Sequence, residues 1–241
     1  MTISKSPVKT YDIVSTYQLN LKHQEIRQNG QSVFWVETNP LAIEIHNQSD
    51  DGPVIAACHT APTSKNLPWT LGNPNYTSQA VDTWPVLQPE GHSTFGAPCT
   101  FDLNSRTYQW KRTHSKSLGG SLFASWNFKL VETSSVHGSA YKTHDGGEPL
   151  PLAVYITTPV VGSSISSSQH LARIDYYESV GEDLELASLV TVLGMVERLG
   201  NANAKGKRDM GNVGMGGSMG LGGLGGGVMG TAGGFGCGGP I

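Results

Sequence analysis

One stretch near the C-terminal end constrains the fold more than any other. Residues 186–196 carry no charged side chain, and their apolar side chains point to every side of a helix. A surface helix shows a single apolar stripe, so a helix that is apolar on most sides must be surrounded by protein or by lipid. The uncharged run is shorter than the ~20 residues needed to cross a bilayer. We therefore expect a helix over residues 182–199 that is buried in protein.

Both ends of this helix carry sequence signals. Ser179 followed by Glu182 matches a capping box, in which each side chain accepts a hydrogen bond from a backbone amide of the other residue. Gly200 directly after Leu199 is typical of a helix C-cap. These signals predict a helix that begins just after Ser179 and ends at Gly200.

The sequence between the N-terminal lead and this helix has the pattern of β-strands. Short segments rich in β-branched and aromatic residues are separated by turn residues, giving about 10–12 strands. Residues 121–132 alternate strictly, with Leu122, Trp126, Phe128 and Leu130 on one face, which is typical of a sheet with one solvated face. We predict a mainly β fold, in which a closed antiparallel barrel of these strands surrounds the C-terminal helix.

Composition divides the chain into three parts. Residues 1–10 form a flexible lead, and residues 11–200 form the barrel domain. Within that domain, residues 60–98 are rich in proline, which breaks strands, so they predict a long irregular excursion with one strand near residues 79–87. Residues 201–241 are rich in glycine and methionine and predict a disordered tail, because glycine at that density does not offset the entropy of ordering the backbone.

The net charge, the N-terminal sequence and the cysteine content limit the functions that the chain is expected to have. A net charge of −3 and a pI of about 6.2 give no overall attraction to nucleic acid. The N-terminus lacks the apolar core of a secretory signal, and we expect no transmembrane segment, so the expected location is cytoplasmic. Three scattered cysteines predict neither a disulfide framework nor a zinc site. We expect no cofactor, no metal and no catalytic residue, hence a non-enzymatic protein, and leave its oligomeric state open.

One cationic patch is of chemical interest. Lys111 and Arg112 lie at the end of an aromatic strand, and Lys129 lies on the solvated face of the next strand. If the two strands pair, the three cations could converge on a phosphate or an anionic lipid headgroup, at about 1 kcal/mol per charge. The alternative is a solvated strand end with ordinary surface charges.

Several segments resemble a known group of barrels: residues 108–112 (YQWKR), 125–130 (SWNFKL), 172–179 (ARIDYYES) and 182–186 (EDLEL). With the expected barrel around a C-terminal helix, residues 11–200 resemble the tubby-like β-barrel group. This group comprises tubby C-terminal domains, LURP-one-related proteins and phospholipid scramblases, and the likeness is closest to small fungal proteins of unknown function.

For tubby domains the resemblance implies phosphoinositide binding through basic residues on neighbouring strands, here Lys111, Arg112 and Lys129. Scramblase activity would need a membrane segment and calcium ligands, and the sequence shows neither. We therefore expect a binding module for an anionic lipid or a protein partner, peripheral at membranes.

Two alternatives stay open. One is a lipocalin-like carrier of a small apolar ligand, which requires an open lumen. The other is an enzyme of unrecognised type, which requires a cleft gathering His59, His92 or His114 with carboxylates.

Overall fold

The computed structural model describes residues 6–18, 21–39, 41–61, 66–74, 76–90, 97–114, 127–133, 151–158 and 168–212. Within these ranges it leaves out the side chains of residues 16–18, 21–23, 78, 168–169 and 201–212. The chain divides into two units, Met1–Asn203 and Ala204–Ile241. Everything below concerns the first unit, except where the end of the C-terminal helix is given.

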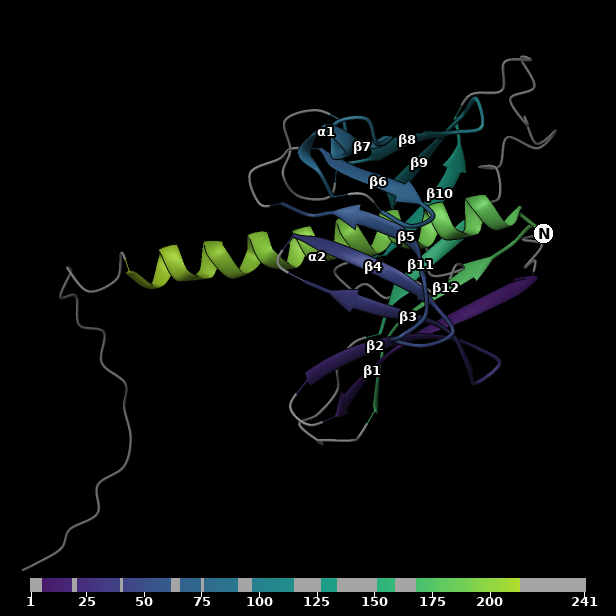
Figure 1. Cartoon of the computed structure of the whole chain (residues 1–241), viewed down its shortest axis with the longest axis horizontal. Coiled ribbons are helices and arrows are strands. Elements are labelled where there is room, and N and C mark those ends of the chain that lie inside the picture. The colour runs from purple at the N-terminus through teal and green to yellow at the C-terminus, as the bar shows by residue number, and fades with distance from the viewer. Residues whose placement is uncertain are drawn as a thin grey trace, which may run out of the picture. The chain divides into compact units, whose positions relative to one another are not determined.

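Twelve antiparallel strands close into a barrel (Figure 1), which confirms the predicted mainly β fold. Each strand pairs with its neighbours in the sequence, and β1 closes the barrel against β12. The strands are β1 Lys9–Gln18, β2 Leu21–Gln28, β3 Gln31–Thr38, β4 Ala42–Asn47, β5 Val54–His59, β6 Leu67–Leu71, β7 Val86–Pro89, β8 Cys99–Leu103, β9 Arg106–Arg112, β10 Phe128–Glu132, β11 Ala153–Thr157 and β12 Ser168–Tyr176.

The N-terminal segment differs from the domain organisation expected above. β1 begins at Lys9, inside residues 1–10, because the backbone amide of Val8 and the first residues of β1 already bond to β12. Phe128 and Leu130 lie in the core as their alternation predicts. Leu122 and Trp126 lie outside the described residues.

The proline-rich excursion, residues 60–98, contributes to the barrel instead of lying outside it. It contains β6, a short helix α1 (Ser78–Val81) and β7. The strand expected near residues 79–87 is thus helical at its start, where the Thr77 hydroxyl accepts a hydrogen bond from the amide of Ala80 (3.3 Å). Proline shortens these strands without preventing them, because the described β6–β7 and β7–β8 pairings are short and tolerate its missing donor.

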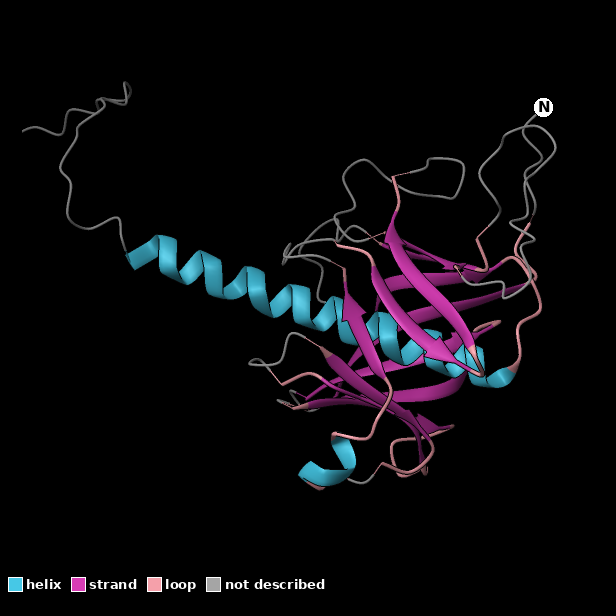
Figure 2. Cartoon of the chain, turned by 90° about the horizontal axis from the view of Figure 1, so that it is seen from above, coloured by secondary structure: helices cyan, strands magenta, loops and turns pink. Residues whose placement is uncertain are grey.

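Helix α2 spans Glu182–Asn212, and its part within the first unit passes through the barrel, with strands on both sides of it in the view from above (Figure 2). Every residue from Leu186 to Met195 is buried. Because this run exceeds two turns, the helix is covered on all sides, as the uncharged sequence predicts. The described core is therefore the contact between α2 and the inward faces of the strands.

α2 begins at Glu182, as predicted, but its N-cap residue and its C-terminal end differ from the predicted ones. The Gly181 carbonyl accepts the bond from the Glu185 amide (3.0 Å), so Gly181 is the N-cap and the Ser179 capping box is wrong. Gly200 lies within the helix and does not adopt the left-handed conformation of a C-cap. The helix therefore continues into the segment that we expected to be disordered, as far as Asn212, and residues 213–241 lie outside the described residues.

Polar side chains of α2 are matched to polar groups of the barrel wall. Trp110 Nε1 on β9 donates to Thr191 Oγ1 (3.1 Å), and that hydroxyl donates to the Ala187 carbonyl (2.6 Å). The hydroxyl groups of Tyr176 and Ser188 lie 2.6 Å apart. A buried donor without an acceptor costs about 1–3 kcal/mol, so these pairs fix the rotation of the helix inside the barrel.

We expect Leu189→Asp to abolish the folded barrel. Leu189 is fully buried, and an unpaired buried charge costs several kcal/mol against a total stability of about 5–15 kcal/mol. Leu189→Met is the control, because it conserves volume and should cost less than about 1.5 kcal/mol. Circular dichroism melting measures both variants. A soluble Leu189→Asp protein that melts cooperatively would contradict the central position of α2.

A close approach of α2 to the wall at Gly194 gives a second prediction. A Cβ added at Gly194 would lie 2.5 Å from Cys58 Sγ on β5, so Gly194→Ala forces a shift in a packed core and should destabilise by about 1–3 kcal/mol. Cys58→Ala removes that sulfur atom and should relieve the clash. In a denaturant double-mutant cycle we expect a favourable coupling of at least about 0.5 kcal/mol. Additive effects of the two substitutions would contradict the contact.

Candidate functional site

Two of the three cations expected to converge lie side by side on the barrel wall. β9 and β10 pair, and their register places Lys111 directly opposite Lys129. The neighbouring pair, Trp110 and Leu130, is fully buried and faces α2. Since side chains alternate along a strand, the two lysines face outward. The structure therefore brings together Lys111 and Lys129 from separate segments of the chain.

Arg112 does not join them. It is the register partner of Phe128, whose side chain lies in the core, so Arg112 stands on the inward-facing side of β9 at the exposed end of the strand. The register therefore does not bring Arg112 to the two lysines, because residues 111 and 112 are consecutive and stand on opposite faces of the sheet.

The two lysines differ in how far their side chains are exposed to solvent. Lys111 is half-buried, whereas Lys129 is only 9% exposed. The outer-face row continues from Lys129 to Val154 on β11 and then to Asp175 on β12. Val154 belongs to a second buried apolar cluster with Ile156 and Tyr177, separate from the core. Lys129 thus lies beside apolar surface, where charge interactions are stronger than in water.

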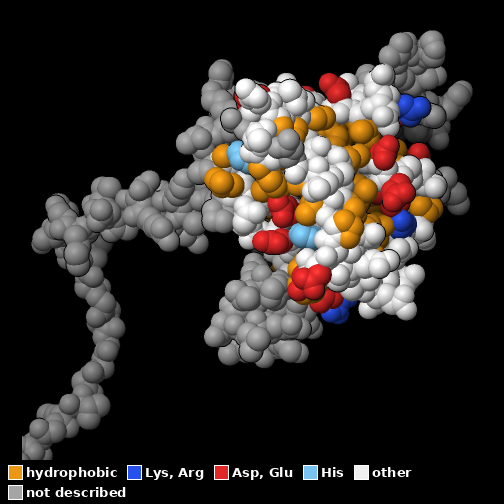
Figure 3. Space-filling view, viewed as in Figure 1, with side chains coloured by type: hydrophobic (Ala, Val, Ile, Leu, Met, Phe, Trp, Pro, Cys, Tyr) orange, Lys and Arg blue, Asp and Glu red, His pale blue; other side chains and the backbone are white. Residues whose placement is uncertain are grey.

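The sequence reasoning missed a second group, formed by Glu37 on β3 and by Glu44 and His46 on β4. Glu37 and Glu44 are register partners, and His46 lies on the same face two residues after Glu44. Acidic side chains and a histidine lie together over these strands in the space-filling view (Figure 3). The alternation of residues 41–46 places Glu44 and His46 on one face, and that signal could have located them.

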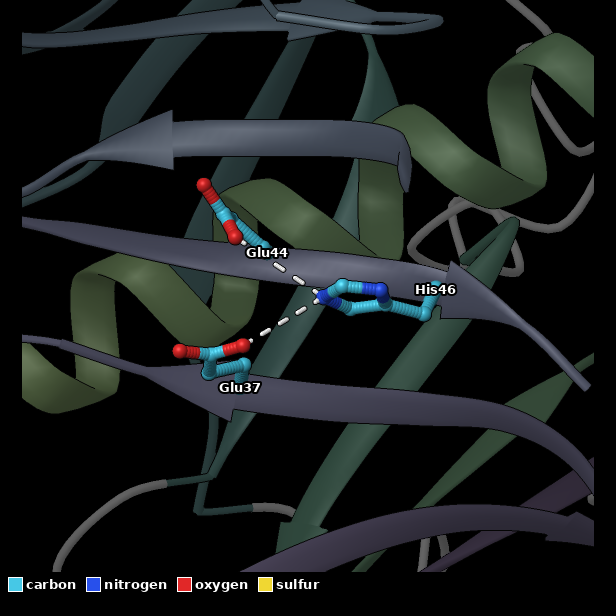
Figure 4. Close-up of side chains that lie close together, drawn as sticks. All are labelled: Glu37, Glu44 and His46. Carbon is cyan, nitrogen blue, oxygen red and sulfur yellow. Dashed lines mark ion pairs between the residues drawn. The ribbon is translucent and has the colours of Figure 1, made fainter. Parts of the chain in front are cut away.

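The side chains of this acid–histidine group point toward one another (Figure 4). His46 Nε2 lies 3.7 Å from Glu37 Oε2 and 3.7 Å from Glu44 Oε2. Tyr76, from the excursion, donates a hydrogen bond to Glu44 Oε1. Burial, together with the hydrogen bond to Glu44, raises the pKa of the Tyr76 hydroxyl, so it stays protonated and remains a donor. One ligand atom from each of Glu37, Glu44 and His46 lies within 4.8 Å of the others, a spacing that could hold a metal ion.

A third polar group joins three strands on the outer wall. His170 Nε2 lies 2.9 Å from Asp12 Oδ1, and His170 Nδ1 lies 2.7 Å from Thr158 Oγ1. The three residues stand on β12, on β1 and just after β11. Both ring nitrogens are therefore engaged in hydrogen bonds between neighbouring strands, and we assign this group a structural role.

The two described cysteines do not form a reactive or metal-binding group with His59. Cys58 is buried against α2, whereas His59, the next residue along β5, has the opposite orientation. Burial raises the pKa of the Cys58 thiol to about 12 and that of the Cys99 thiol to about 11. Both thiols are thus protonated near neutral pH and are poor nucleophiles and ligands.

These features define a closed antiparallel barrel with a helix in its lumen and two polar groups of interest on its outer wall. No protein-family model, curated protein or solved structure matches the chain. The resemblance to tubby-like barrels therefore stays a prediction. In the part of the chain that the structure describes, no helix is long and apolar enough to cross a membrane.

Proposed function

We propose that this protein is a non-enzymatic binding module that holds an anionic, phosphate-type group on its outer wall at Lys111 and Lys129. The observation that carries the proposal is the direct register pairing of the two lysines. Like charges directly opposite each other on neighbouring strands are destabilising, by a magnitude of roughly 0.2–1 kcal/mol. An anion placed between the two ammonium groups would be attracted to both of them at once.

The filled lumen supports an outer-wall site. A lipocalin-like carrier needs an open interior, whereas α2 occupies the interior here and packs against the inward faces of the strands. A ligand would have to displace buried side chains such as Leu189 and Val192. Each of these contributes about 1.5–3 kcal/mol by its burial, which disfavours a ligand in the lumen.

The two lysines would contribute differently. Lys111 is the more exposed of the pair and would make the first contact with an anion. Lys129 lies beside the apolar cluster around Val154, where a bound charge is less screened. Arg112 has no part in this site, because it stands on the other side of β9.

We expect Lys111→Glu to weaken binding to phosphatidylcholine vesicles that contain phosphatidylinositol bisphosphate. The loss should be about fivefold or more, since one cation near an anionic surface contributes about 1 kcal/mol. Adding Lys129→Met, which removes the buried charge but keeps most of the volume, should weaken binding further. Vesicle sedimentation measures the binding, and soluble inositol trisphosphate is tested in parallel by calorimetry.

Arg106→Glu is the matched control, because Arg106 lies at the other end of β9 and its substitution changes the net charge equally. It should leave binding close to that of the unmodified protein. Binding of inositol trisphosphate without vesicle binding would assign the site to a soluble phosphate or to a phosphorylated protein partner. If the unmodified protein binds neither probe, or if Arg106→Glu weakens binding as much as Lys111→Glu, the proposal is wrong.

A further inference from the structure

We propose that Glu37, Glu44 and His46 form a binding site for a divalent transition-metal ion, such as Zn²⁺, on the outer face of β3 and β4. The site is independent of the lysine pair, which lies on β9 and β10. Its ligands would be one imidazole nitrogen and two carboxylate oxygens, a donor set that Zn²⁺ accepts.

The orientation of His46 is the first argument. Its Nδ1 lies 2.9 Å from the Gly52 carbonyl, an acceptor, so Nδ1 carries the proton and donates. In the neutral ring this leaves the lone pair on Nε2, the atom that faces the two glutamates. Metal-ligating histidines are commonly held in this way, with the second ring nitrogen bonded to a backbone carbonyl or a carboxylate.

The burial of His46 is the second argument. The residue is only 7% exposed, and Nε2 has no hydrogen-bond partner among the described residues. A buried polar atom without a partner costs about 1–3 kcal/mol, so such an atom needs an explanation. Both carboxylate oxygens lie 3.7 Å away, too far for a hydrogen bond. A cation between the three groups would satisfy Nε2 and both glutamates together.

The spacing fits an ion of this size. In a tetrahedral site, two ligand atoms bound at about 2.1 Å lie about 3.4 Å apart. The two 3.7 Å separations from Nε2 exceed this spacing only slightly. The third separation, between the carboxylates, is within 4.8 Å. Because the Glu37 side chain is 57% exposed, it is free to rotate and to close that distance.

The side chain of Glu44 is oriented by a hydrogen bond so that one of its oxygens faces the proposed ion. Its Oε1 accepts the hydrogen bond from Tyr76, and its Oε2 is the oxygen that faces His46. Tyr76 in turn packs against Trp84, with ring centroids 5.7 Å apart. This outer contact fixes one ligand, whereas the exposed Glu37 leaves one side of the site open. Three protein ligands with an open side are typical of zinc sites that exchange a water or a ligand.

The competing occupant is a proton, because a protonated His46 ring would also be attracted to both carboxylates. An imidazole ligand favours Zn²⁺ and its neighbours over Mg²⁺ and Ca²⁺, which prefer oxygen ligands alone. The test must therefore separate zinc binding from an ion pair that needs only a proton.

The experiment titrates ZnCl₂ into the full chain, without an affinity tag, near neutral pH by calorimetry. It is repeated with Co²⁺, whose visible absorption reports the coordination geometry. We expect one site, a rise in melting temperature with added ZnCl₂, and absorption bands of bound Co²⁺. Glu37→Gln should weaken zinc binding at least about tenfold, and because Glu37 is exposed this variant should fold normally. His46→Gln should abolish the site.

His170→Gln is the matched control, since His170 also lies beside a carboxylate, Asp12. It should bind zinc like the unmodified protein. No heat and no change in melting temperature at millimolar ZnCl₂ would overturn the proposal and leave a protonated ion pair. Zinc binding that survives both Glu37→Gln and His46→Gln, or that is lost in His170→Gln, would overturn it as well.

Discussion

The structure depends on one contact, the burial of α2 inside the barrel. Several strands are short, and the described pairings of β6 with β7 and of β7 with β8 are shorter still. Such ladders stabilise a barrel weakly by themselves. They close because their inward side chains share one apolar partner, the stretch of α2 from Leu184 to Leu199, which lies in the lumen and belongs to the same buried cluster. Lys9 and Tyr11 of β1 fix the start of this partner through Glu185 (2.7 and 3.2 Å), beside the strand pair that closes the barrel.

This arrangement decides where function can lie. An interior filled by a helix offers little room to a ligand, so we place our proposed sites on the outer wall, whose side chains are not needed for packing on α2. Two outward features stand out, a lysine pair on β9 and β10 and an acid–histidine group on β3 and β4. Both are made by cross-strand register, because residues on separate strands meet at the width of one strand pair.

The fold could be predicted from the sequence where a single property, such as the absence of charge or strict alternation, decides the local structure. The uncharged run of α2 leaves a buried helix as the simplest outcome, and alternation identifies strands such as β10. Prediction failed where two rules compete. Proline argues against strands, yet β6 and β7 pair over stretches that need few donors, and Gly200 argues for a helix end although the helix continues. The candidate sites could be predicted only in part: strand pairing brings Lys111 to Lys129 and alternation places Glu44 with His46, whereas Glu37 joins them through a β3–β4 register that no local pattern fixes.

Hydrogen–deuterium exchange of the α2 backbone amides tests the central claim most directly. If α2 is enclosed by the closed barrel, its amides from Leu189 to Met195 are shielded from solvent until the barrel opens. They should then exchange only through global unfolding, as slowly as the best-protected strand amides and with the same denaturant dependence. If these amides exchange through a local opening while the strands stay protected, the helix is not the element around which the barrel closes.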